Sequence, residues 1–151
     1  MPRVAILTGS KSDLPTLEPC TQTLGQLGIE HEVHVMSAHR SPQKVQQFAS
    51  SAEAAGFEVM IAAAGMAAHL PGVVAAYTRL PVIGVPIASG SHGVSGTDSL
   101  LSIVQMPPGI PVACMAINGA KNAALFAAAI LALKHDSVRD ALVKFREEQS
   151  K

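Results

Sequence analysis

The segment Ser37–Arg40 follows directly on His31–Met36, in which polar and apolar residues largely alternate. Within it, His39 and Arg40 combine an imidazole with a fixed positive charge. Histidine is the side chain best suited to proton transfer near neutral pH, and arginine presents a planar fork that fits phosphate or carboxylate. The pair therefore indicates a proton-transfer site beside an anion anchor. The alternative is a solvated loop histidine next to a surface arginine, and these two residues alone do not decide between them.

A second candidate site is the segment Gly9–Asp13, which separates an apolar stretch from a helical pattern. Its backbone amides, the hydroxyls of Ser10 and Ser12, and the start of a helix suit a single phosphate group. The spacing matches neither the Walker loop nor the dinucleotide glycine pattern, so neither ATP nor a dinucleotide is indicated. Asp13 either binds sugar hydroxyls or caps the helix, and the local sequence favours neither.

Other chemistries find less support in the sequence. His39, His69 and His92 each follow an apolar stretch, but they lack the close pairing and the carboxylates of familiar zinc sites, so no metal is predicted. Cys20 and Cys114 lie inside expected elements, and no Gly-x-Ser-x-Gly elbow occurs, so nucleophilic catalysis is not indicated. What remains is acid–base catalysis by histidine on a phosphorylated small molecule, without a cofactor. No role is predicted for His92.

The elements that position these loops read as five short strands alternating with helices. The expected strands are Arg3–Thr8, Glu30–Met36, Val59–Ala64, Pro81–Val85 and Val112–Ile117. Helical patterns follow each of them, and a last amphipathic helix contains Val138, Leu142 and Phe145. This alternation predicts a parallel, doubly wound α/β sheet in one domain, 1–151. Since the carboxyl ends of such strands share one edge, all candidate loops should meet there, where ligands bind.

Composition narrows the class of partner. The net charge is zero and the basic residues are scattered, which argues against nucleic acid and anionic membrane surfaces. The longest apolar run, Ala123–Leu133, is too short to span a membrane, for which about 18 residues are needed. No signal-peptide pattern is present and the cysteines stand alone, so a reducing cytoplasmic location is expected.

The surface should be partly covered by further copies of the chain. Only 15% of residues are charged and 48% are hydrophobic. A monomer of this size carries about a quarter charged residues on average. The shortfall predicts a homo-oligomer. The helix of small residues after Asn122 is the expected contact.

Taken together, the loops resemble one known family. The matching segments are Gly9–Asp13, Ser37–Arg40, Ala67–Gly72, Asp98–Leu100 with Ser102–Pro107, and Ala120–Ala124. In this order, over nearly the whole chain, they are similar to the bacterial-type (class I) PurE family of N5-carboxyaminoimidazole ribonucleotide mutases. The resemblance implies a flavodoxin-like three-layer α/β/α sandwich with a five-stranded parallel sheet, a homo-octamer, and no metal or ATP. It also implies interconversion of N5-carboxyaminoimidazole ribonucleotide and 4-carboxy-5-aminoimidazole ribonucleotide in purine (IMP) biosynthesis.

The same resemblance implies roles for individual residues. His39 would act as general acid and then general base, with His69 as the second catalytic histidine. The phosphate would lie at Ser10, Ser12 and Arg40, and the ribose hydroxyls at Asp13. The remaining substrate-binding residues, some of them walling a pocket for freed carbon dioxide, would be Lys11, Ser37, Ala38, Gly65, Ala67 and Leu70.

Two alternatives stay open at this point. A second branch of the family carboxylates aminoimidazole ribonucleotide directly with carbon dioxide. It commonly has Lys at the position of Arg40 and an Arg-Ser-Asn run around Ala67–His69, so this chain resembles the mutase branch. The other alternative is a flavodoxin-like module that binds a nucleotide without chemistry, although one Tyr and no Trp make a flavin site less favoured.

Two departures from the family pattern bear on the expected pocket. Met66 stands where the family often has glycine, which would narrow the pocket or alter the backbone. The loop Ile87–Gly96 is longer than usual and carries His92.

Overall fold

The computed structural model describes residues 1–151 and contains one five-stranded, all-parallel sheet. Its strands are β1 (Arg3–Thr8), β2 (Glu30–Val35), β3 (Val59–Gly65), β4 (Val82–Ile87) and β5 (Ala113–Cys114). They are arranged in the order β2-β1-β3-β4-β5, which is the flavodoxin-like order. The predicted parallel α/β sandwich is thus confirmed. From β1 the chain passes to β2 on one side of it, and the later strands β3, β4 and β5 lie on its other side. The loops after β1 and β3 therefore diverge and leave a crevice between them.

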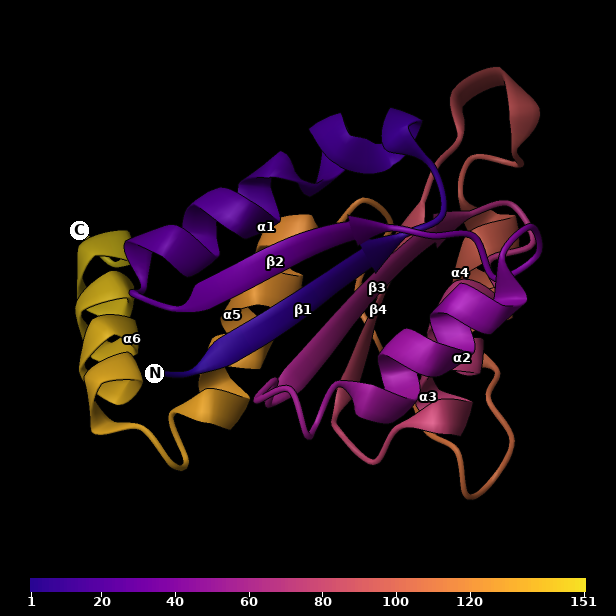
Figure 1. Ribbon diagram of the computed structural model, residues 1–151. Helices are drawn as coiled ribbons and strands as arrows, with labels where there is room; N and C mark the ends of the chain where they lie inside the picture. The colour runs from indigo at the N-terminus through magenta and orange to yellow at the C-terminus, as the bar shows by residue number, and fades with distance from the viewer.

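Helices cover both faces of the sheet. They are α1 (Leu14–Gln26), α2 (Pro42–Ser51), α3 (Leu70–Tyr77), α4 (Thr97–Val104), α5 (Ala120–Leu131) and α6 (Asp136–Gln149), with short 3-10 turns η1 (Lys11–Asp13) and η2 (Gly90–His92). Figure 1 shows α1 and α5 on one side and α2, α3 and α4 on the other, with α6 beside α1 and α5. No helix is both long enough and apolar enough to cross a membrane.

Alternate residues of the central strands supply two separate cores. In β1, Val4 and Ile6 pack with α1 and α5, whereas Ala5 and Leu7 pack with α2 and α3. All four side chains are fully buried, and complete burial of one large apolar side chain contributes about 1.5–3 kcal/mol. This two-sided burial explains why the central strands are continuously apolar in sequence. It also fixes the strand ends, from which the polar loops start.

The helix of small residues turns its alanines inward. Ala123, Ala124, Ala127 and Ala128 are fully buried in the core between α5, α1 and the sheet. Their small size lets α5 approach the sheet closely. On the outer side of the same helix, Phe126 remains 41% exposed. The alanine stripe itself is therefore explained by packing within the chain.

The last two strands differ from the predicted ranges. Strand β4 runs on to Ile87, whereas β5 has only two residues in place of the predicted Val112–Ile117. The carbonyls of Gly84 and Pro86 accept hydrogen bonds from the amides of Met115 and Asn118 in the β5 segment. Pro86 therefore faces β5 but has no N–H to return, so the ladder stops there.

Candidate active site

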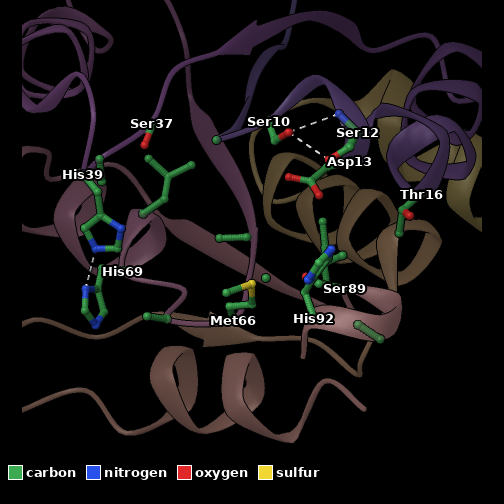
Figure 2. Close-up of a pocket in the computed structure, with 18 of the residues that line it drawn as sticks. Ser10, Ser12, Asp13, Thr16, Ser37, His39, Met66, His69, Ser89 and His92 are labelled. Carbon is green, nitrogen blue, oxygen red and sulfur yellow. Dashed lines mark hydrogen bonds between the residues drawn. The ribbon is translucent and has the colours of Figure 1, made fainter. Parts of the chain in front are cut away.

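A cavity of about 580 Å³ opens at the carboxyl edge of the sheet, between the loops that follow β1, β2, β3 and β4. Figure 2 shows its polar side chains converging from these loops. The lining residues are Gly9, Ser10, Ser12, Asp13, Thr16, Ser37–Arg40, Ala64–Ala67, His69, Leu70, Ile87–Gly90 and His92. The predicted convergence of the loops on one edge is therefore what the fold produces.

Two imidazoles meet at one end of this cavity. Nε2 of His39 lies 2.7 Å from Nδ1 of His69, and the two rings are nearly perpendicular at 86°. One nitrogen must donate and the other accept, so the two rings share a single proton across this bond. Figure 2 shows the other nitrogen of the His39 ring turned toward the middle of the cavity. A proton released there can be replaced through the bonded pair.

The turn after β1 brings hydroxyls and a carboxylate to the opposite end. Ser10 and Ser12 join their Oγ atoms at 2.8 Å, and the amide of Ser12 donates to Ser10 Oγ. Asp13 stands at the N-terminus of α1, but its side chain makes no capping bond there. Instead its Oδ2 accepts a hydrogen bond of 2.7 Å from the Thr8 hydroxyl. The capping alternative is thus excluded, and the other carboxylate oxygen remains available for a ligand.

Arg40 is the cation of the cavity wall. Its Nη2 donates to the Gly9 carbonyl at 3.1 Å and its Nε donates to Ser37 Oγ at 3.3 Å. Neither partner is a carboxylate, so the positive charge of Arg40 is not neutralised within the chain. These two bonds tie the loop after β2 to the loop after β1. They hold a guanidinium with further N–H donors in reach of an anion.

The loop between β3 and α3 forms the floor. A Cβ at Gly65 would lie 2.0 Å from Ser89 Oγ and 3.2 Å from the Ile87 carbonyl, so glycine lets the β3 and β4 loops approach closely without moving Ser89. Met66 follows with a φ of 53°, in the left-handed region. Two short backbone bonds then connect the amides of Ala68 and His69 to the carbonyls two residues before each. This tight turn delivers His69 to His39.

The structure brings the predicted site residues together with one exception. Lys11 is an exposed residue at the start of the η1 turn, and it does not line the cavity. Among the lining residues that were given no role from the sequence, three have polar side chains: Thr16, Ser89 and His92. The spacing of Thr16 from Asp13, three residues apart on one helix face, is a signal that could have found it. The loop of Ser89 and His92 follows a predicted strand and is therefore expected at this edge, but no local pattern shows which of its side chains enter the cavity.

No group of three or more His, Cys, Asp or Glu side chains is arranged to hold a metal ion. His39 and His69 are hydrogen-bonded to each other through one ring nitrogen of each. Burial raises the pKa of the Cys20 thiol to about 12 and also raises that of Cys114. Neither thiol lines the cavity, so the chemistry of the site is that of its histidines.

Comparison with known proteins agrees with this geometry. The model of the family described as AIR carboxylase matches residues 3–151. The chain belongs to this family. The N5-carboxyaminoimidazole ribonucleotide mutase of Pyrococcus abyssi is 52% identical over 151 residues, covering 100% of this chain and 86% of that protein. The mutase of Pseudomonas aeruginosa is 54% identical over 149 residues, covering 97% and 90%.

A solved member of the AIR carboxylase family shares the architecture. The crystal structure of Treponema denticola PurE superimposes with a TM-score of 0.89 at 30% identity, covering 99% of this chain and 92% of that one. The resemblance deduced from the loops is therefore confirmed at the level of family and fold.

Proposed function

We propose that this chain is an isomerase that interconverts N5-carboxyaminoimidazole ribonucleotide and 4-carboxy-5-aminoimidazole ribonucleotide. The observation that carries the proposal is the hydrogen-bonded pair of His39 and His69, in one cavity with a cationic and hydroxylic end. Two relatives at 52% and 54% identity bear the name of this mutase. Residues 1–151 act as one catalytic unit, without metal or cofactor.

In the first half of the reaction the bond between the exocyclic nitrogen and the carboxylate breaks. The electron pair stays on nitrogen, which takes a proton from His39, and carbon dioxide is released into the cavity. His69 supports this step by sharing its proton with Nε2 of His39. The apolar groups of Ala67 and Leu70, beside Gly65, line the part of the cavity that holds the freed carbon dioxide.

In the second half, ring carbon C4 attacks carbon dioxide and forms the new carbon–carbon bond. C4 then carries both the carboxylate and its original hydrogen. His39, now lacking its proton, removes that hydrogen as a proton and restores the aromatic ring. The histidine ends the cycle in its starting state, so no external acid, base or cofactor is consumed.

The other end of the cavity holds the ribose phosphate. Ser10 and Ser12 offer hydroxyls to the phosphate, and Arg40 offers a charge that has no protein counter-ion. Asp13 keeps one carboxylate oxygen for the ribose hydroxyls, since Thr8 occupies the other. Ser37 and Ala38 hold the wall between this end and the histidines. Anchoring the phosphate fixes the distance from the ring to His39.

The experiment supplies each substrate separately to purified protein and follows the absorbance of the product. Turnover of N5-carboxyaminoimidazole ribonucleotide supports the proposal. Turnover only of aminoimidazole ribonucleotide with carbon dioxide would identify a carboxylase instead. Binding of either compound without turnover would leave a nucleotide-binding module.

The active form is proposed to be a cytoplasmic homo-oligomer, with the octamer as the size that the family resemblance implies. Large apolar side chains stay exposed on the helical surface: Phe126, Leu133 at 84% and Val143 at 53%. Burying such side chains between copies would remove apolar area from water. Both cysteines are free thiols, as in a reducing compartment. Light scattering tests the assembly, and a stable monomer would contradict it.

A further inference from the structure

Met66 holds a backbone conformation that costs free energy for its residue type. Its φ is positive, at 53°, and Ser95 and Asn118 are the only other non-glycine residues with a positive φ. Left-handed backbone brings Cβ against the following carbonyl, and asparagine is among the few side chains that tolerate it. Asn118 also uses its side-chain oxygen to accept a bond from the Ala88 amide. Methionine has no such compensation.

The turn alone does not explain a methionine. The left-handed residue at 66 starts the turn, and the two short backbone bonds around Ala67 and Ala68 then carry the chain to His69, which meets His39. Glycine adopts this conformation without steric cost. The turn would therefore form with glycine and with less strain, so the reason for the side chain must lie in what the side chain touches.

Packing within the chain does not explain it either. Met66 is 47% exposed, although it is a large apolar residue, and it lines the main cavity. Figure 2 shows its thioether on the cavity floor, between the His39–His69 pair on one side and Ser89 and His92 on the other. Because this side chain lines the cavity, a ligand bound there would bury its apolar area. Strain at such a position is typical of functional sites.

We propose that Met66 is a specificity-determining residue whose thioether contacts the heterocycle of the substrate. This inference rests on the proposed function, which places the phosphate at Ser12 and Arg40 and the reacting ring at His39. Figure 2 shows Met66 on the cavity floor, apart from Ser10 and Ser12, so the ring and not the phosphate is placed over it. A methionine sulfur packs favourably against an aromatic ring. The residue thereby favours a flat heterocycle and resists its tilting during the two proton transfers.

The test compares Met66→Gly and Met66→Leu with the wild type. Calorimetry measures binding of 5-aminoimidazole ribonucleotide, which carries the ring, and of ribose 5-phosphate, which lacks it. M66G should weaken binding of the ring compound at least fivefold and leave ribose 5-phosphate within twofold. Its Tm should be unchanged or higher, because the strain is relieved. M66L, which keeps the apolar bulk but lacks the sulfur, should weaken binding of the ring compound less than M66G does and leave ribose 5-phosphate within twofold of the wild type.

Unchanged binding of the ring compound by M66G would overturn the proposal, as would equal weakening of both ligands. If M66G fails to fold, Met66→Ala keeps the backbone strain but removes the thioether, and it should show the same selective loss. Failure of the proposed function has a different signature. In that case the wild type does not convert N5-carboxyaminoimidazole ribonucleotide, whatever the two binding ratios are.

Discussion

The two edges of the sheet both carry charged and polar side chains but use them in opposite ways. At the amino edge, charged groups are satisfied by one another. Arg3 donates to Glu32 at 2.6 Å and lies over the Phe57 ring at 4.4 Å. Glu58 accepts from Lys134 at 3.0 Å and from His135 at 2.8 Å, which joins the start of β3 to the region between α5 and α6.

These partners change the titration of the two carboxylates. The hydrogen bond from Arg3 is the main cause that lowers the pKa of Glu32. For Glu58 the largest single effect is burial, which raises the pKa. The hydrogen bonds from Lys134 and His135, with their charges, outweigh burial, so the pKa of Glu58 is lowered overall. Both carboxylates are thus ionised and paired in the folded chain at neutral pH.

At the carboxyl edge the charges are left unpaired. Arg40 bonds only a carbonyl and a hydroxyl, Asp13 bonds only a hydroxyl, and the two histidines bond one another. Keeping a cation without a counter-ion gives up stability that a salt bridge could add, but it leaves the charge for a ligand. In this molecule, charged groups paired with one another stabilise the fold, and charged groups left without a counter-ion face the cavity. Mutations at the amino edge should therefore change stability, and mutations at the carboxyl edge should change activity or substrate binding.

The largest effect is expected from His39→Asn. Asparagine can hydrogen-bond but cannot transfer the proton, so kcat should fall about 10²- to 10⁴-fold. Binding of 5-aminoimidazole ribonucleotide and the Tm should stay close to the wild type. The matched control is His31→Asn at the other edge, where the ring bonds only the Ile29 carbonyl. Equal losses of activity in both variants would break the comparison.

Arg40→Ala should mainly raise KM. A hydrogen bond to a charged group is worth about 1.5–3 kcal/mol, which corresponds to roughly 10- to 100-fold in binding. Lys11→Ala removes a cation from the same loop cluster but not from the cavity wall, and its KM should change less than threefold. Steady-state kinetics at fixed salt measures both. A larger effect for Lys11 than for Arg40 would show that the phosphate lies outside the cavity.

Glu58→Gln should lower the free energy of unfolding by about 1 kcal/mol at neutral pH and leave kcat unchanged. The pKa of this carboxyl is lower in the folded than in the unfolded chain. Its contribution is therefore complete above the unfolded pKa and is lost as the pH falls through the folded pKa. The difference in urea unfolding between E58Q and wild type should shrink as the pH falls below about 4.3, the ordinary value for Glu, and disappear below the folded pKa.

Asp140→Asn, an exposed change on α6 without an ion-pair partner, is the control for this variant and should be neutral. A difference between E58Q and wild type that persists at low pH would mean that the carboxylate charge is not what stabilises this edge.

The smallest effect is expected from Glu32→Gln. This carboxylate is exposed, so its bonds to Arg3 and His34 are screened by water. The change in Tm should be smaller than for E58Q and should disappear at high salt. Thermal unfolding at low and high ionic strength measures it. A salt-independent loss would mean that Glu32 stabilises the fold by something other than its charge.

The sequence predicts the sheet and the edge that binds ligand well, because apolar strands and polar loops alternate strictly. It is less successful where an outcome depends on a neighbouring strand. The short β5 follows from Pro86 on the adjacent strand, which lacks a donor. Likewise, no local sequence pattern predicts that the Asp13 carboxylate accepts a hydrogen bond from Thr8 and does not cap α1.

Within the site, the predicted strand order brings the loops after β1, β2, β3 and β4 to one edge, and residues of all four loops line one cavity. Ser10, Ser12 and His69 lie within four residues of a strand end, which keeps them close to that edge. His92 lies several residues beyond β4, and its entry into the cavity depends on anchors such as the bond from Ala88 to Asn118. Lys11 belongs to the same motif but does not line the cavity, because a motif shows which residues are near a site and not which way each side chain points.

The most direct test of the central claim follows the fate of the carboxylate. N5-carboxyaminoimidazole ribonucleotide labelled with ¹³C in the carboxylate is converted in the presence of excess unlabelled bicarbonate, and the product is analysed by mass spectrometry. If the cavity at the carboxyl edge transfers carbon dioxide internally from nitrogen to carbon, most of the label appears in 4-carboxy-5-aminoimidazole ribonucleotide. A product whose carboxylate has equilibrated with the unlabelled bicarbonate would contradict the account.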